Sequence, residues 1–124
     1  MVKKEVKTDK APQSSSPYSQ GLVVGNRVYV AGQVPRNPAT GEIPEGIEKQ
    51  THQVMMNLKN IVEAAGGTMD NVVKSTVHLA NLDDFEAFNK AYRGYFNPPY
   101  PVRTTVGSTL FGGILVEIDV VAEL

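Results

Sequence analysis

The chain contains no cysteine among its 124 residues, so disulfide bonds and thiolate metal sites are excluded. Its 12 lysines and arginines nearly balance its 13 aspartates and glutamates. The resulting net charge of -1 gives no electrostatic reason to expect nucleic acid or an anionic membrane as a partner. No apolar run approaches the roughly 20 residues that a membrane-spanning helix needs, and residues 1–16 have no apolar leader segment. We therefore expect a cytoplasmic protein.

Familiar site motifs are also missing. Gly112-Gly113 falls between two predicted strands and not before a helix, so it is not a phosphate-binding loop. The two histidines, His52 and His78, fall in a predicted helix and a predicted strand, which gives no metal-ligand spacing, and no metal site is predicted. A histidine pair could in principle cleave RNA as acid and base. The sequence shows no basic patch that would hold the phosphates.

The sequence does have a clear change between two-residue and helical periodicity. A length of 124 residues suits one domain, residues 1–124. The predicted strands cover residues 2–7, 21–24, 27–32, 72–80, 102–109 and 115–123. The predicted helices cover 47–65, which Gly66-Gly67 ends, and a segment from Phe85 that the prolines at 98–99 end. This order predicts an α+β fold in which both helices pack on one face of a mixed sheet.

The last two predicted strands carry the candidate site. Val116 and the alternate residues after it form an apolar stripe for the core, so Glu117 points to the other face. We place Val102 and Val106 on the core side as well, which puts Arg103 on the same face as Glu117. Nothing in the chain is left to cover that face. We therefore expect a homo-oligomer with this pair near the subunit boundary.

Five residues could carry chemistry. Arg103 could bind the carboxylate of a ligand through two parallel hydrogen bonds. Alternatively, it could form a salt bridge with Glu117 or Asp119 of the chain itself. Glu117 could hold and polarise a water molecule. Three further residues are weaker candidates: Tyr18 as a pocket cap or packed loop residue, Gly32 as a close backbone approach or a turn residue, and Asn89 as a cleft wall or solvated residue.

With these residues in view, the sequence resembles the reactive-intermediate (imine/enamine) deaminase family, of the RidA or YjgF type. The resemblance runs from Ala11-Pro12 to the C-terminus. Its marks are Pro17-Tyr18-Ser19-Gln20, Gly32-Gln33-Val34-Pro35, Thr40-Gly41-Glu42, Gln50, Asn57-Leu58, Asp84-Phe85, Asn89, Tyr92, Pro101-Val102-Arg103 and Val116-Glu117-Ile118. Each mark is weak alone, but their order and spacing are specific.

The resemblance implies a chorismate-mutase-like fold, a homotrimer with clefts at the subunit interfaces, and no metal or cofactor. It implies hydrolysis of 2-imino acids or their enamine tautomers (2-iminobutyrate, 2-iminopropionate, 2-aminoacrylate) to 2-keto acids and ammonia. By resemblance, Arg103 binds the carboxylate, Glu117 positions water, and the backbone N–H groups of Gly32 and Thr105 hold the substrate. Tyr18 would line the cleft across a subunit boundary, and Asn89 would brace its wall.

Several positions depart from the family pattern, namely Ser16, Ala31, Thr105 and the segment from Thr109 to Gly112. None of them removes the arginine or the glutamate. Two other functions stay open. One is a non-catalytic trimer that binds small carboxylates and regulates a partner, and the other is the endoribonuclease or translation-inhibitor role attached to some relatives.

Overall fold

The computed structural model of the protein describes residues 2–124. Its strands are β1 (Lys3–Val6), β2 (Gly21–Val24), β3 (Arg27–Gln33), β4 (Val72–Leu79), β5 (Val102–Gly107) and β6 (Val116–Glu123). Its α-helices are α1 (Ile47–Ala64) and α2 (Phe85–Arg93), with 3₁₀ turns at Met69–Asn71 and Leu82–Asp84. The predicted element order is confirmed. Helix α2 ends earlier than predicted, because the chain leaves the helix at Gly94 and buries Phe96 in the core before the prolines.

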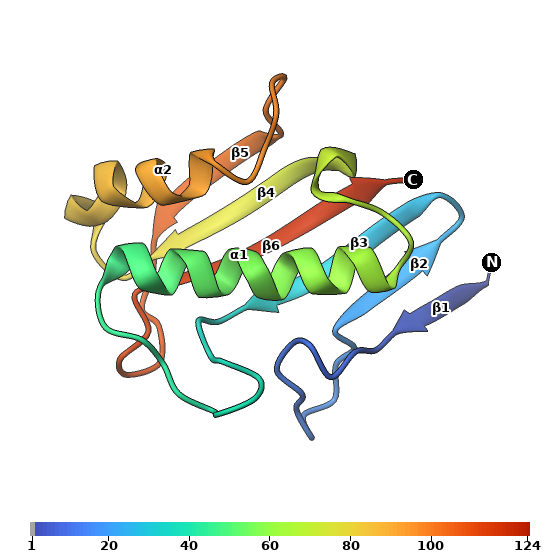
Figure 1. The fold of residues 1–124 in the computed structure, drawn as a ribbon, viewed down its shortest axis with the longest axis horizontal. Coiled ribbons are helices and arrows are strands. Elements are labelled where there is room, and N and C mark those ends of the chain that lie inside the picture. Colours follow the sequence, from blue (N-terminus) through green and yellow to red (C-terminus); the bar gives the residue numbers. More distant parts are fainter. Residues whose placement is uncertain (1) are drawn as a thin grey trace.

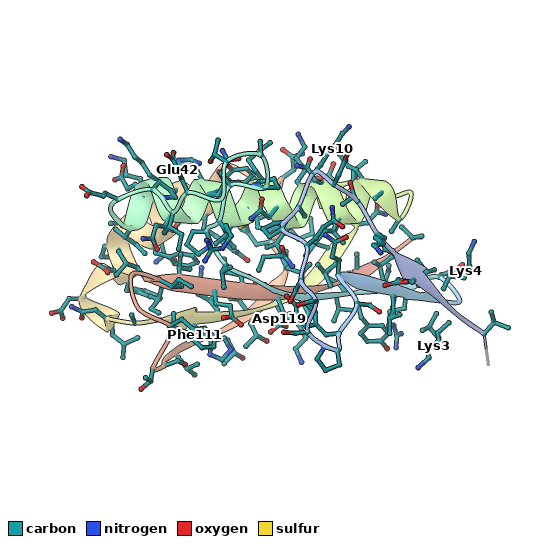
Figure 2. The ribbon with its side chains drawn as sticks, turned by 90° about the horizontal axis from the view of Figure 1, so that it is seen from below. Lys3, Lys4, Lys10, Glu42, Phe111 and Asp119 are labelled. Atoms are coloured by element: carbon teal, nitrogen blue, oxygen red, sulfur yellow. The ribbon has the colours of Figure 1, made fainter. Side chains whose placement is uncertain are left out.

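The strands form one mixed sheet in the order β1-β2-β3-β6-β4-β5. All neighbours are antiparallel except β4 and β5, which run parallel. Both helices lie over the same face, with α2 near the β5 edge (Figure 1). Figure 2 shows the molecule from the side, with the helices above the sheet and no helix beneath it. The prediction that one face stays uncovered is therefore confirmed for residues 2–124.

The core lies between α1 and the sheet. Helix α1 buries one stripe, formed by Val54, Met55, Leu58, Ile61 and Val62, against the inward residues of β3 and β6. Gly66 ends the helix with a φ of 98°, and the N–H of Gly67 donates to the Val62 carbonyl at 3.0 Å. This is a glycine C-cap that satisfies the last helical carbonyls.

Strand β3 carries an irregularity that matters for the site. Val30 pairs with Val120 and Gln33 with Ile118, so two residues of β3 oppose a single residue of β6. The extra residue makes a β-bulge at Ala31-Gly32, which bends the strand end and re-aims its backbone. Gly32 is thereby placed against the residue that β6 presents on the uncovered face, Glu117.

The predicted facing of β5 is wrong. Arg103 and Thr105 stand beside Ser75 and Val77 of β4, which are buried under the helices. Val102 and Val106 lie on the uncovered face, and 68% of Val102 is exposed. The reason is the in-register pairing with β4, because paired residues in neighbouring strands share a face. At this edge the helix side is filled by the aromatic rings of α2, which accept an arginine as well as a valine.

Candidate functional site

The guanidinium of Arg103 is held by aromatic rings. Its Cζ atom lies 5.5 Å from the ring centre of Phe85, 5.4 Å from that of Phe88 and 5.0 Å from that of Tyr92. We call these three side chains the aromatic cage. No carboxylate among residues 2–124 lies within 4.0 Å of Arg103, so the alternative interpretation, a salt bridge to Glu117 or Asp119, is not what the structure shows. The cage stabilises the cation without neutralising it.

Arg103 opens into a cavity of about 270 Å³ at the β5 edge. The cavity is lined by Asn89, Tyr92, Arg93, Tyr100, Pro101 and Arg103. Asn89 is therefore brought to the same cavity as Arg103, as the resemblance implied. The lining offers two guanidinium groups and an amide but no carboxylate, which suits an anion.

The backbone of β5 adds a donor beside Arg103. The N–H of Ser108 donates to the Leu79 carbonyl at 2.9 Å, so the amide of Ser108 faces β4. Because amides alternate in direction along a strand, those of Arg103 and Thr105 face away from the sheet, at its open edge. The Oγ1 atom of Thr105 is buried and has no hydrogen-bond partner in the described chain. The N–H groups of Arg103 and Thr105 therefore have no strand partner on that side among residues 2–124.

Tyr92 fixes the floor of the aromatic cage. Its hydroxyl hydrogen-bonds to the Ser75 hydroxyl of β4 at 2.7 Å, inside the core. Burial raises the pKa of Tyr92, although Ser75 and the nearby Arg103 act against that rise. The phenol therefore stays neutral at physiological pH, and its ring contributes to the cage without forming an ion pair.

Glu117 lies on the uncovered face, away from the cage. A Cβ atom at Gly32 would come within 2.5 Å of the Glu117 Oε2 atom, so the carboxylate sits directly over this glycine. Glu117 also borders a second cavity, of about 490 Å³, lined by His78, Ser108, Thr109, Leu110, Phe111 and Glu117. Two of the predicted site residues, Gly32 and Glu117, are thus in contact.

Arg103 and Glu117 do not share a face within one chain, and this corrects the sequence prediction. Arg103 points to the helix side of the edge strand, whereas Glu117 alternates with the buried Val116 and Ile118 of β6. Tyr18 lies apart from both, in the loop before β2, with 56% of its surface exposed. The structure thus presents two half-sites, one built on Arg103, Asn89 and Thr105, and one on Gly32 and Glu117.

Sequence reasoning missed two features of these half-sites. The sequence marks Phe85 and Tyr92 only as part of the family resemblance, but the steps of 3 and 4 from Phe85 through Phe88 to Tyr92 also line up three rings on one helix face. The pairing of His78 with Ser108, whose Nδ1 and Oγ atoms are 2.7 Å apart, links β4 to the residue that follows β5, and no local sequence pattern indicates it. Within residues 2–124, no cluster of three metal-binding side chains occurs and no helix is long and apolar enough to cross a membrane.

The fold and the half-sites define a small α+β protein with an arginine held by aromatic rings at the edge of its sheet. The family model described as Endoribonuclease L-PSP matches residues 8–124. The chain belongs to this family, which is that of the RidA and YjgF proteins.

Among its relatives, a RutC family protein of Pyrococcus abyssi is 44% identical over 124 residues, which cover 98% of each chain. The 2-iminobutanoate/2-iminopropanoate deaminase of Escherichia coli is 38% identical over 125 residues, again covering 98% of each. A protein of Lactococcus lactis named as a candidate regulator, AldR, is 42% identical over 123 residues and 98% of each chain. The relatives therefore carry names of more than one kind.

Solved structures agree closely with the fold. RidA from a Psychrobacter species is 41% identical, with a TM-score of 0.94 over 98% of this chain and 99% of that one. TdcF of Escherichia coli, solved with bound serine, is 34% identical, with a TM-score of 0.93 over 98% of both chains. At these identities the likeness supports the family as well as the fold.

Proposed function

We propose that the protein hydrolyses 2-imino acids, or their enamine tautomers, to 2-keto acids and ammonia. The observation that carries the proposal is the Arg103 guanidinium, which three rings hold in a cavity with no carboxylate partner. Such a cation binds a substrate carboxylate through parallel hydrogen bonds. The deaminase name of the Escherichia coli relative supports the same reaction.

The active site would be completed by a second copy of the chain. One copy presents Arg103 at a sheet edge, and the Gly32 and Glu117 half-site lies on the uncovered face. That face also exposes Tyr29, Val102 and Val106, which are apolar side chains suited to a subunit interface. We infer a homotrimer of chorismate-mutase-like subunits, in which each cleft takes Arg103 from one copy and Glu117 from the next.

In this cleft each group has one role. Arg103 and the outward N–H of Thr105 hold the substrate carboxylate, and Asn89 forms the cavity wall beside them. Glu117 orients the water that attacks the imine carbon and accepts its proton. Gly32 leaves room for the Glu117 carboxylate, and Tyr18 of an exposed loop closes the cleft.

A coupled assay tests the proposal. Threonine dehydratase generates 2-iminobutyrate in the presence of semicarbazide, and the wild-type protein should suppress semicarbazone formation. Arg103→Ala and Glu117→Gln should both lose this effect, while circular dichroism shows them folded. If the folded wild-type protein does not suppress semicarbazone formation, the proposal that it deaminates 2-iminobutyrate is wrong.

The second candidate is a carboxylate-binding regulator, which the name of the Lactococcus lactis relative favours. Glu117→Gln separates the two functions, because it should abolish deamination yet leave the binding of a 2-keto acid largely intact. The ribonuclease role gains no support from the histidines. His52 belongs to α1 on the helix side and bonds to Tyr95, whereas His78 lies on the uncovered face.

A further inference from the structure

His78 of β4 lies beside Glu117 on the uncovered face. It lies directly opposite Glu117 in the antiparallel pairing of β4 and β6, where facing side chains are about 5 Å apart at their Cβ atoms. Both residues line the 490 Å³ cavity on the uncovered face. The His78 Nδ1 atom bonds to the Ser108 hydroxyl at 2.7 Å, which fixes the ring and leaves Nε2 without a protein partner in the described chain.

We propose that His78, oriented by Ser108, is the second acid–base group of the active site and acts in alternation with Glu117. The inference rests on the proposed deaminase function and adds a catalytic residue to it. This role requires the tautomer in which Nδ1–H donates to the Ser108 hydroxyl. Nε2 is therefore the atom that gives and takes the proton.

Imine hydrolysis needs two protons to be donated and two to be accepted, and two groups that act in alternation can do both. In the first step, water attacks the imine carbon and passes a proton to Glu117, while the C=N electron pair takes a proton from the His78 imidazolium. The product is a neutral carbinolamine. In the second step, the protonated Glu117 gives its proton to the amino nitrogen, and the C–N bond breaks to release ammonia. The hydroxyl proton returns to His78 as the keto group forms, so both residues regain their starting states.

The charged groups around His78 lie on β6 and on its own strand. Glu117 and Asp119 face it from β6, and the only cation nearby on its own strand is Lys74, four residues away. The neighbouring residues of β5 and of the following loop, Val106, Ser108 and Thr109, carry no charge. The ionisable neighbours of His78 are thus Glu117, Asp119 and Lys74.

The decisive experiment is chemical rescue. His78→Ala should lower kcat/KM by about 100-fold or more, the usual contribution of a positioned acid–base group. Added imidazole should restore part of the activity, because the emptied site opens into the cavity. His78→Gln fills the same space without titrating, so it should lose as much activity as His78→Ala and should not respond to imidazole. Ser108→Ala should lower kcat about tenfold and leave KM unchanged, because it only loosens the ring.

His52→Ala is the matched control. His52 is the other histidine, and it also bonds a hydroxyl, that of Tyr95 at 2.8 Å, but it lies on α1. It should retain full activity and show no imidazole effect. If wild type is active and His78→Ala stays within threefold of it, or gains nothing from imidazole, the role of His78 is overturned while the deaminase function stands. If wild type itself is inactive, both proposals fall.

Discussion

The carboxylate of Glu117 occupies the space that any side chain at position 32 would need. The Oε2 atom lies 2.5 Å from the point where a Cβ on Gly32 would be, and the Cδ atom lies at 3.3 Å. The bulge in β3 creates this approach by turning the Gly32 backbone toward β6. The position of the Glu117 carboxylate thus depends on the absence of a side chain at position 32 of the neighbouring strand β3.

Gly32→Ala should therefore reduce activity without unfolding the protein. The atom that must move is the end of a flexible side chain, so the structural cost is small, but the carboxylate shifts by about 1 Å. Such a displacement lowers kcat/KM by about 100-fold. The semicarbazide assay and a thermal melt measure the two effects.

Gly94→Ala is the control for that experiment, because its Cβ would meet nothing within 4 Å and its φ of -70° suits alanine. It should match wild type in rate and melting temperature. Full activity in Gly32→Ala would show that the carboxylate does not need its present position.

The sequence was sufficient for the elements but not for the facing of the edge strand. Gly25, with a φ of 61°, and the glycine stop at Gly66 follow from local backbone chemistry, so the hairpin and the end of α1 were predictable. The placement of Glu117 followed from the alternation in β6, a buried central strand. Strand β5 has no such constraint. Val102 and Arg103 could each face the helices, and only the parallel register with β4 decides between them.

The candidate site was predictable as a set of residues but not as an arrangement. Arg103, Glu117, Gly32 and Asn89 all reappear in the half-sites. Their separation onto two faces depends on pairings between segments far apart in the sequence, which no local pattern encodes.

The aromatic cage should set the affinity for carboxylates. Phe85→Leu removes one of the three rings over Arg103 while keeping the site apolar. A cation–π contact contributes about 0.5 to 2 kcal/mol, so the Kd for 2-ketobutyrate should rise by about 2-fold to 30-fold. Isothermal titration calorimetry measures this directly, whether or not the protein turns the ligand over.

Phe96→Leu controls for a general loss of packing. Phe96 is buried, and the centre of its ring lies 4.9 Å from that of Tyr92. It is not one of the three rings that hold the Arg103 guanidinium. It should lower the melting temperature and leave the Kd unchanged. An equal rise in Kd for both variants would show that the rings act through packing alone.

Asp119 should make the stability of the protein fall as pH rises. Burial raises its pKa above the ordinary 3.8, and the neighbouring His78, Lys74 and Thr76 only partly oppose the shift. The folded state therefore binds the proton more tightly than the unfolded state. Stability is lost as pH rises from about 4 through the folded pKa.

Asp119→Asn removes that ionisation. The variant should be more stable than wild type at pH 7, by less than about 1 kcal/mol because solvent screens a half-exposed group, and equal to it below about pH 4. Urea titrations at fixed protein concentration at both pH values give the comparison. Asp9→Asn, a change at an exposed residue, controls for the loss of one charge. A variant that is less stable at pH 7 would mean that Asp119 is paired in the assembled protein.

Mixing two inactive variants tests whether one cleft draws on two copies. If each site takes Arg103 from one chain and Glu117 from the next, neither Arg103→Ala nor Glu117→Gln is active alone. Unfolded together in equal amounts and refolded, they should regain about a quarter of wild-type activity, since one site in four receives both intact residues.

The matched control mixture is wild type with the double variant. It should fall to about a quarter of the wild-type value per total chain if sites are shared, and to about a half if each chain works alone. Zero activity in the first mixture together with one half in the second would place both residues in one chain's site, which requires β5 to turn over relative to β4.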